Sequence, residues 1–258
     1  MEQLAVTFIQ TTLSWEEPAI NRQHFTEKIN ALTAPTDLII LPEMFTTGFS
    51  MNSKALAEPE QGPTLAWLQK MAQQQEAAIS GSVITKARDR YFNRLYMVFP
   101  DGSYQCYDKR HLFSFAGEDR AYAAGQEKLL VNYKGWKICP LICYDLRFPV
   151  WARNTADYDF LFYIANWPDK RTAQWDALLQ ARSIENQCYT LGLNRIGSDG
   201  NSHHYDGHSA VYNALGERVS AANWEGELTE TVVLEKAHLT NTRTTFPFLN
   251  DRDAFEMV

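Results

Sequence analysis

The stretch WKICPLICYDLRFP, residues 136–149, is largely apolar as far as Cys143 and then becomes polar and aromatic. A continuous apolar run of this length is typical of a strand that is buried on both faces of a sheet. The stretch DLIILPE, residues 37–43, has the same character and also ends in a polar residue. Because open α/β sheets bind ligands beyond the carboxyl ends of their strands, we expect a ligand site where these two stretches end.

Segments typical of strands and of helices alternate along the chain around residues 136–149. Seven segments are rich in β-branched or aromatic residues and have the length of strands, namely 4–12, 37–43, 77–85, 91–100, 136–145, 159–166 and 188–197. Three segments have the apolar spacing of helices, namely 16–32, 63–76 and 172–187. The alternation predicts a layered α/β fold. Turn signals at Asp101 and Gly102, and at Leu215 and Gly216, predict two hairpins and therefore mixed sheets.

Length and charge restrict the kind of protein that this chain can be. Its 258 residues fit a single domain spanning residues 1–258, since single cores extend to roughly 250–300 residues. The net charge of −7 is spread along the chain, which argues against nucleic acid or a membrane surface as the partner and favours a small molecule. The N-terminal segment lacks the features of a signal peptide, so we expect a cytoplasmic protein whose four cysteines are free thiols.

Three apolar strand-like segments each end in one ionisable residue. These are Glu43 in LPEMF, Lys109 in YDKRHLF and Cys143 in LICYDLRFP. In one pocket, a thiolate can attack a carbonyl, a carboxylate can transfer the protons, and an ammonium can stabilise the oxyanion. Taken singly, each has an ordinary structural alternative, because cysteine is often inert packing and the two charged residues are often solvated.

Taken together, the segments LPEMFTTGF, YDKRHLF, CYDLRFP and ANWP resemble the nitrilase (carbon–nitrogen hydrolase) superfamily, and most closely its ω-amidase branch. The similarity covers almost the whole chain, from AVTFIQ (5–10) to NRIGSDG (194–200). The resemblance implies a four-layer α-β-β-α sandwich with mixed sheets, in agreement with the α/β pattern. It also implies a cysteine-dependent amidase that needs no metal or other cofactor.

The resemblance assigns a role to each matching residue. Glu43 corresponds to the general base, Lys109 to the oxyanion-stabilising lysine and Cys143 to the nucleophile. Glu118, in GEDRAYAAG, fits the position of a second glutamate in the site, with an exposed loop acid as the alternative. The backbone N–H of Tyr144 would complete the oxyanion site. An ammonium beside the carboxylate would also favour the ionised forms of the glutamate and the thiol.

The two cysteines of the central stretch are expected to differ. Cys139 lies within the strand and precedes Pro140, so it is predicted to be packing. Cys143 begins the exit of the chain from the strand, where an elbow would expose its sulfur. A zinc or redox pair is the alternative, but no neighbouring cysteine or histidine completes a ligand set.

Candidate substrate-binding residues lie near these motifs. Arg171, which precedes a helix, could bind a substrate carboxylate, with Arg147 as the second candidate and a solvated arginine as the alternative for either. Arg147 could instead pair with Asp145. Trp167 could form a wall of the pocket or belong to the core. The cluster SHHYDGH (202–208), with His203, His204 and His208, is interpreted as a polar loop and not as a metal site.

The predicted reaction is hydrolysis of the ω-amide of small 2-oxo dicarboxylic acid monoamides, such as 2-oxoglutaramate, as the resemblance implies. Hydrolysis of N-carbamoyl amino acids or of nitriles would use the same three residues. A non-catalytic binding scaffold is the alternative from another class of protein. The resemblance, together with Phe246, Phe248 and Phe255 in the segment TTFPFLNDRDAFEMV (244–258), predicts a homodimer.

Overall fold

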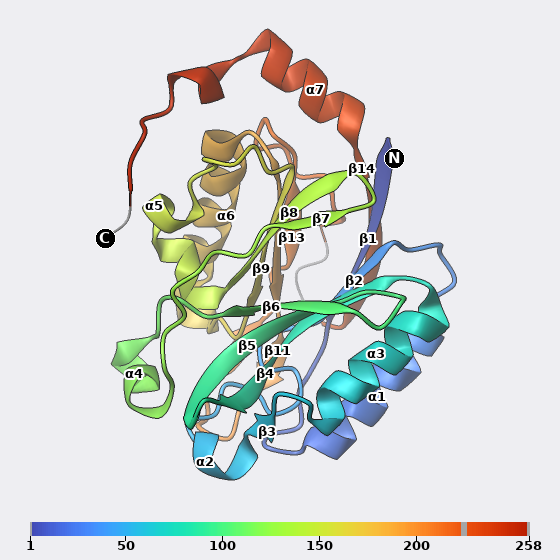
Figure 1. The fold of residues 1–258 in the computed structure, drawn as a ribbon, viewed down its shortest axis with the longest axis vertical. Helices are drawn as coiled ribbons and strands as arrows, with labels where there is room; N and C mark the ends of the chain where they lie inside the picture. Colours follow the sequence, from blue (N-terminus) through green and yellow to red (C-terminus); the bar gives the residue numbers. More distant parts are fainter. Residues whose placement is uncertain (1, 223–225, 257–258) are drawn as a thin grey trace.

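The computed structural model describes residues 2–222 and 226–256 and contains two facing β-sheets, each covered by helices on its outer side (Figure 1). This arrangement is the predicted α-β-β-α sandwich. The predicted domain (1–258) and the phenylalanine-rich segment (244–258) extend beyond the described residues at their ends. Within the described residues, no helix is both long enough and apolar enough to cross a membrane.

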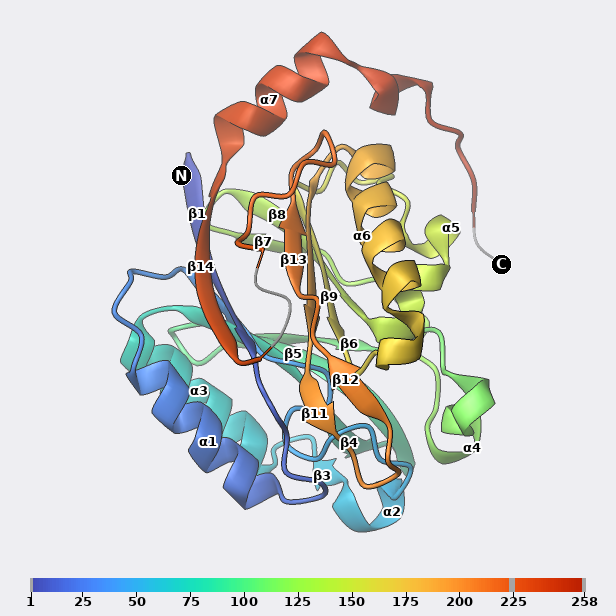
Figure 2. The ribbon, with the colours of Figure 1, turned by 180° about the vertical axis from the view of Figure 1, so that it is seen from behind.

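The first sheet contains parallel and antiparallel neighbours in the order β14-β1-β2-β4-β5-β6, with β3 paired to β4. Its strands are β1 (Gln3–Gln10), β2 (Leu38–Ile40), β3 (Glu58–Pro59), β4 (Ala78–Ala87), β5 (Arg90–Val98), β6 (Tyr104–Asp108) and β14 (Leu228–Glu235). β1, β2 and β4 run parallel, whereas β5, β6 and β14 are antiparallel to their neighbours. Two helices, α1 (Pro18–Asn30) and α3 (Pro63–Gln75), cover its outer face (Figure 2).

The strand β2 shows why the sequence around it is apolar at every position. Successive side chains of a strand point to opposite faces of its sheet. Leu38 and Ile40 enter the core between the two sheets, whereas Ile39 and Leu41 pack in the cluster that contains residues of α1 and α3. Both faces of this strand are therefore buried, as the unbroken apolar run predicted.

The second sheet has the order β13-β10-β9-β8-β7, with β8, β9 and β10 parallel. Its strands are β7 (Val131–Tyr133), β8 (Trp136–Ile142), β9 (Phe160–Ala165), β10 (Tyr189–Asn194) and β13 (Ala210–Tyr212). The helices α5 (Pro149–Ala152) and α6 (Thr172–Asn186) cover its outer side. A Cβ at Gly192 of β10 would lie 2.2 Å from Leu179 Cδ1 of α6, so the close approach of this helix requires glycine.

Two features at the chain's C-terminal side differ from the sequence predictions. The hairpin predicted over 210–222 forms its turn, but outside β13 only one bridge, between Tyr212 and Arg218, pairs its two arms. β14 and the following helix α7 (Lys236–Thr245) were not predicted. Only Val232 and Leu234 of β14 are buried, so its local apolar signal is weak, and pairing with β1 stabilises it. The small hairpin of β11 (Ile196–Ser198) and β12 (His204–Asp206) lies outside both sheets.

Candidate active site

Strand ends from both sheets meet at one end of the sandwich. Glu43 follows β2 after a short connection, and Lys109 directly follows β6 of the same sheet. Cys143 directly follows β8 of the opposite sheet. The candidate site therefore lies between the two layers, and the sheet packing brings together the three residues that the sequence motifs singled out.

Lys109 is bonded to two carboxylates in the interior. Its Nζ donates a hydrogen bond of 2.9 Å to Glu43 Oε1 and bonds of 3.0 and 2.9 Å to the two oxygens of Glu118. The side chains of all three residues are wholly buried. Glu118 begins the short helix α4 (Glu118–Ala121), and its Oε2 also accepts a 2.6 Å bond from the Phe113 N–H. Glu118 is thus a buried partner of the lysine and not an exposed loop acid.

Two asparagines that the sequence motifs did not single out hold Glu43 in place. Asn93 Nδ2, from β5, donates a 2.8 Å bond to Glu43 Oε1. Asn166, which follows β9, donates its backbone N–H to Glu43 Oε2 at 2.8 Å and its Nδ2 to the Glu43 carbonyl at 2.7 Å. Asn166 lies in the quoted motif ANWP, whereas Asn93 is a single polar residue in an apolar strand, for which the sequence offers no distinguishing signal.

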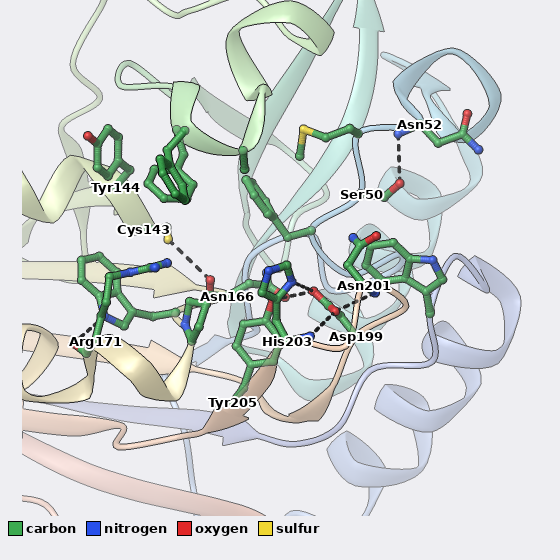
Figure 3. Close-up of a pocket in the computed structure, with 18 of the residues that line it drawn as sticks. Ser50, Asn52, Cys143, Tyr144, Asn166, Arg171, Asp199, Asn201, His203 and Tyr205 are labelled. Carbon is green, nitrogen blue, oxygen red and sulfur yellow. Dashed lines mark hydrogen bonds and ion pairs between the residues drawn. The ribbon is translucent and has the colours of Figure 1, made fainter.

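Cys143 and Cys139 occupy different environments. Cys143 begins the 3₁₀ turn η2 (Cys143–Arg147), lines the pocket and is 9% exposed, with Sγ 4.0 Å from the carbonyl oxygen of Asn166 (Figure 3). Cys139 is wholly buried within β8. Only the first of these thiols faces the pocket.

The electrostatics of the thiol differ from the sequence expectation. Burial, and after it the Glu43 carboxylate, raises the pKa of Cys143 well above its ordinary value, although Lys109 acts in the opposite direction. The expectation that the neighbouring ammonium favours an ionised thiol is therefore wrong for the resting site. The reason is that desolvation and two carboxylates outweigh a single cation that these carboxylates already bind. A base must remove the proton during the reaction.

Charge pairing also sets the state of the lysine. Burial alone lowers the pKa of Lys109, but Glu118 and Glu43 overcome this effect, and the pKa is raised. Burial raises the pKa of Glu118, and Lys109 opposes that rise. Lys109 therefore remains a cation beside the thiol at neutral pH, available to a developing negative charge.

The pocket at Cys143 has a volume of about 620 Å³ and has charged residues in its lining. Arg171 ends the 3₁₀ turn η3 (Asp169–Arg171), and its guanidinium lies 5.3 Å from the centre of the Phe113 ring. Among the described residues, no carboxylate forms an ion pair with Arg171. In Figure 3, Arg171 and Asn201 lie on opposite sides of Asn166.

The other predicted pocket residues are also at this cavity. Arg147 lies over the Trp167 ring at 4.8 Å and donates a hydrogen bond to Gln174. Trp167 combines both predicted roles, because it lines the pocket and also contacts the core ring of Trp175 at 5.4 Å between centroids. Tyr144, whose backbone N–H was assigned to the oxyanion site, lines the cavity as well.

Asp145 does not pair with Arg147. Its carboxylate is wholly buried and accepts hydrogen bonds from Tyr107 and His111, which flank Lys109 in the sequence. Arg147 instead extends toward the pocket, where it contacts Trp167. The alternation of buried and exposed positions in η2 sends these two side chains in different directions.

The three histidines of the 202–208 cluster contact different aspartates. His203 lies 3.1 Å from Asp199 at the pocket, and His204 lies 3.4 Å from Asp169. His208 lies 3.0 Å from Asp176 of α6. In the part of the chain that the structure describes, no group of three or more metal-binding side chains is gathered at one point.

Comparison with known protein families gives a match along nearly the whole chain. Residues 4–243 match the family described as carbon–nitrogen hydrolase. The chain is 44% identical over 257 residues to the protein named Omega-amidase YafV from Escherichia coli (strain K12), covering 100% of both chains. It is 31% identical over 251 residues to the 2-oxoglutaramate amidase of Bacillus subtilis (strain 168), covering 95% of this chain and 96% of that relative.

Solved structures show the same similarity in three dimensions. The crystal structure of XC1258 from Xanthomonas campestris, described as a CN-hydrolase superfamily protein, matches with a TM-score of 0.96 and 43% identity, covering 100% of both chains. The structure of Nit3 from Saccharomyces cerevisiae, described as a member of the nitrilase superfamily, matches with a TM-score of 0.85 and 24% identity, covering 95% of each chain. The second match supports the fold alone.

Proposed function

Because the chain belongs to the carbon–nitrogen hydrolase family and is a hydrolase of carbon–nitrogen bonds, we propose that it hydrolyses the ω-amide of small 2-oxo dicarboxylic acid monoamides. The products would be the dicarboxylic acid and ammonia, formed through a thioester on Cys143. Two relatives support this substrate class, since one is named an omega-amidase and the other a 2-oxoglutaramate amidase.

In the first half of the reaction, Glu43 takes the proton from the Cys143 thiol as the sulfur attacks the amide carbon. The negative charge that develops on the amide oxygen is stabilised by Lys109 and by the Tyr144 N–H. The carbon–nitrogen bond then breaks, and Glu43 returns the proton to the leaving nitrogen, so that ammonia departs. The raised pKa of Cys143 makes this transfer necessary, because little thiolate exists before the substrate binds.

In the second half, Glu43 takes a proton from water, and the hydroxyl adds to the thioester carbon. The carbon–sulfur bond breaks, the acid is released, and the proton returns to Cys143. Glu43 is suited to both steps because Asn93 and Asn166 hold its carboxylate from two sides. Glu118 fixes the lysine from the side opposite to Glu43 without a contact to the thiol.

The pocket supports a compact substrate with a free carboxylate. Arg171 is a cation at the cavity that bears the thiol, and no described carboxylate forms an ion pair with it. A 2-oxo acid amide can place its carboxylate against this guanidinium while its amide carbon meets the sulfur. Arg147 has partners in Trp167 and Gln174, which makes it the second candidate for this contact.

The observation that carries the proposal is the wholly buried Lys109 bonded to both Glu43 and Glu118 behind a pocket-facing cysteine. Burial of three charges is costly, so a scaffold without catalysis would gain nothing from this arrangement. The non-catalytic alternative is disfavoured for the same reason.

Ammonia release from a panel of small compounds tests the proposal. The panel contains 2-oxoglutaramate, its uncharged analogue without the carboxylate, an N-carbamoyl amino acid, and a nitrile matched to the amide. The highest kcat/KM is expected for 2-oxoglutaramate. Faster turnover of the nitrile or of the N-carbamoyl compound would replace the ω-amidase assignment, and no turnover of any compound would favour the scaffold.

A further inference from the structure

The backbone at Cys143 adopts a conformation that needs support from its surroundings. Its φ angle is +43°, in the left-handed region that residues with a side chain rarely occupy. Such a conformation persists only where neighbouring contacts hold it, and it is found preferentially at functional sites. In this elbow the strain sets the direction in which the sulfur leaves the end of β8.

One buried carboxylate next to the elbow supplies many of these contacts. Asp145 Oδ2 accepts hydrogen bonds of 3.0 Å from the Ile142 N–H and 2.7 Å from the Tyr107 hydroxyl. Asp145 Oδ1 accepts bonds of 3.0 Å from the His111 N–H and 2.8 Å from His111 Nδ1. Four donors from three segments therefore converge on a single side chain.

The positions of these donors relate the elbow to the lysine. Ile142 directly precedes the nucleophile, whereas Tyr107 and His111 lie two residues before and two residues after Lys109. Lys109 belongs to the first sheet and Cys143 to the second. The Asp145 carboxylate is thus a direct bridge between the two segments that carry the ammonium and the thiol.

The network around this bridge is complete and rigid. The Tyr107 hydroxyl also accepts bonds of 3.0 Å from Trp151 Nε1 and 3.1 Å from the Arg110 N–H. The His111 ring stacks on Phe148, the residue that follows η2, with 3.7 Å between ring centroids and 5° between planes. Each partner of Asp145 is therefore itself held by a second contact.

Stability alone does not account for a carboxylate at this place. Asp145 is wholly buried, and among the described residues no lysine or arginine forms an ion pair with it. Burial of a carboxylate without a permanent cation is costly even when hydrogen bonds satisfy it. Position is what it provides, because four fixed donors around one charged group leave little freedom to either segment.

We propose that Asp145 is a positioning residue that holds the Cys143 elbow at a set distance and orientation from Lys109. Through Ile142 on one side and Tyr107 and His111 on the other, it keeps the sulfur, the ammonium and the Tyr144 N–H in the arrangement that attack on an amide requires. The proposal rests on the proposed function in treating Cys143 and Lys109 as the reacting groups. Asp145 itself contacts neither the substrate nor the reacting atoms.

The substitution Asp145→Asn tests this role, with Asp159→Asn as the matched control. Asp159 is also a buried aspartate, accepts a 2.9 Å bond from the Lys137 N–H and pairs with Lys236 and Arg243, but it does not line the pocket. Both variants should unfold at a lower temperature. Only Asp145→Asn should lower kcat, by about 10²-fold with KM within threefold of wild type, as expected when reacting groups are displaced.

A second variant keeps the charge of Asp145 and removes one of its bonds. Tyr107→Phe should lower kcat by about 10-fold with little change in KM. Since both substitutions disturb the same bridge, the loss in the double variant should be smaller than the product of the two single losses. If Asp145→Asn fails to fold, Tyr107→Phe decides the question, and a folded Tyr107→Phe enzyme with wild-type kcat overturns the proposal.

A measurement without substrate separates this proposal from the proposed function. The rate of Cys143 alkylation by iodoacetamide, followed against pH by mass spectrometry, depends on the distances of the thiol from Lys109 and Glu43. Its pH midpoint should move in the same direction in Asp145→Asn and Tyr107→Phe and stay unchanged in Asp159→Asn. Unchanged midpoints in both variants would overturn the positioning role, whereas a wild-type enzyme inactive on every amide would overturn only the proposed function.

Discussion

Lys109 Nζ donates a 2.9 Å hydrogen bond to Glu43 Oε1, although 66 residues separate the two in the sequence and both side chains are wholly buried. The bond joins the end of β6 to the connection after β2 within one sheet. Together with Glu118, it forms a charged cluster that no solvent screens. The expected behaviour of the enzyme follows from this cluster and from the thiol that faces it across the sandwich.

Cys143→Ala should abolish amide hydrolysis, because it removes the sulfur that would form the thioester. Cys139→Ala is the control, since this thiol is wholly buried in β8. It should retain most of the activity and lose about 1–2 kcal/mol of unfolding free energy from the cavity. Ammonia release and urea denaturation measure the two effects. Alkylation of Cys139 before Cys143 in the folded protein would contradict the assignment.

Glu43→Gln should lower kcat by about 10²-fold or more, because it removes the base but keeps the shape. The Glu43 carboxylate contributes to the raised pKa of Cys143, so its neutralisation should make the thiol easier to ionise. The residual rate should therefore climb as the pH is increased from 7 to 10. Glu60→Gln, at a half-exposed partner of Arg94, is the control and should behave like wild type. A Glu43→Gln enzyme with a normal rate at pH 7 would exclude the mechanism.

Lys109→Met should lower activity by about 10²–10³-fold through loss of an oxyanion donor. It should also lower the unfolding free energy by about 3–5 kcal/mol, because it leaves two buried carboxylates without a cation. Adding Glu118→Gln to this variant should restore part of the stability and none of the activity. Thermal denaturation and ammonia release distinguish the two outcomes. A double variant less stable than Lys109→Met would show that the carboxylates do not repel each other.

Arg171→Ala should raise KM about 10-fold or more for an ω-amide that bears a carboxylate, because it removes a charge-assisted contact. An uncharged amide of the same length should be little affected. Arg147→Ala serves for comparison, since this side chain packs on Trp167 and its loss should affect both substrates alike. Steady-state kinetics on the two amides provide the measurement, and an equal change on both for Arg171→Ala would remove it from the carboxylate site.

The protein is expected to form a homodimer through the face that carries α5 and the C-terminal segment. Val150 of α5 is 55% exposed, and it lines a surface groove together with Phe255. Val150→Glu should weaken the dimer, whereas Val233→Glu on β14, at a residue that is 50% exposed, should not. Sedimentation velocity at micromolar concentration measures the association. A monomeric wild-type protein would refute the prediction.

The three long helices were predicted by apolar spacing to within about two residues of their ends, as α1, α3 and α6 show. The strands of both sheets that are buried on two faces were predicted equally well, because continuous burial leaves a continuous apolar run. β14 was missed since half of its residues face solvent and its partner, β1, lies at the opposite end of the chain. A strand stabilised mainly by distant pairing carries little local signal.

The sequence by itself determined which residues stand at the strand ends and which family motifs they form, because both are properties of short, contiguous segments. Only the tertiary structure decided that Glu118 shares the lysine with Glu43, that the thiol keeps its proton at rest, and that Asp145 bridges to Tyr107 and His111. These facts depend on burial and on distances between segments far apart in the chain. Sheet packing sets both, and no local pattern of residues contains them.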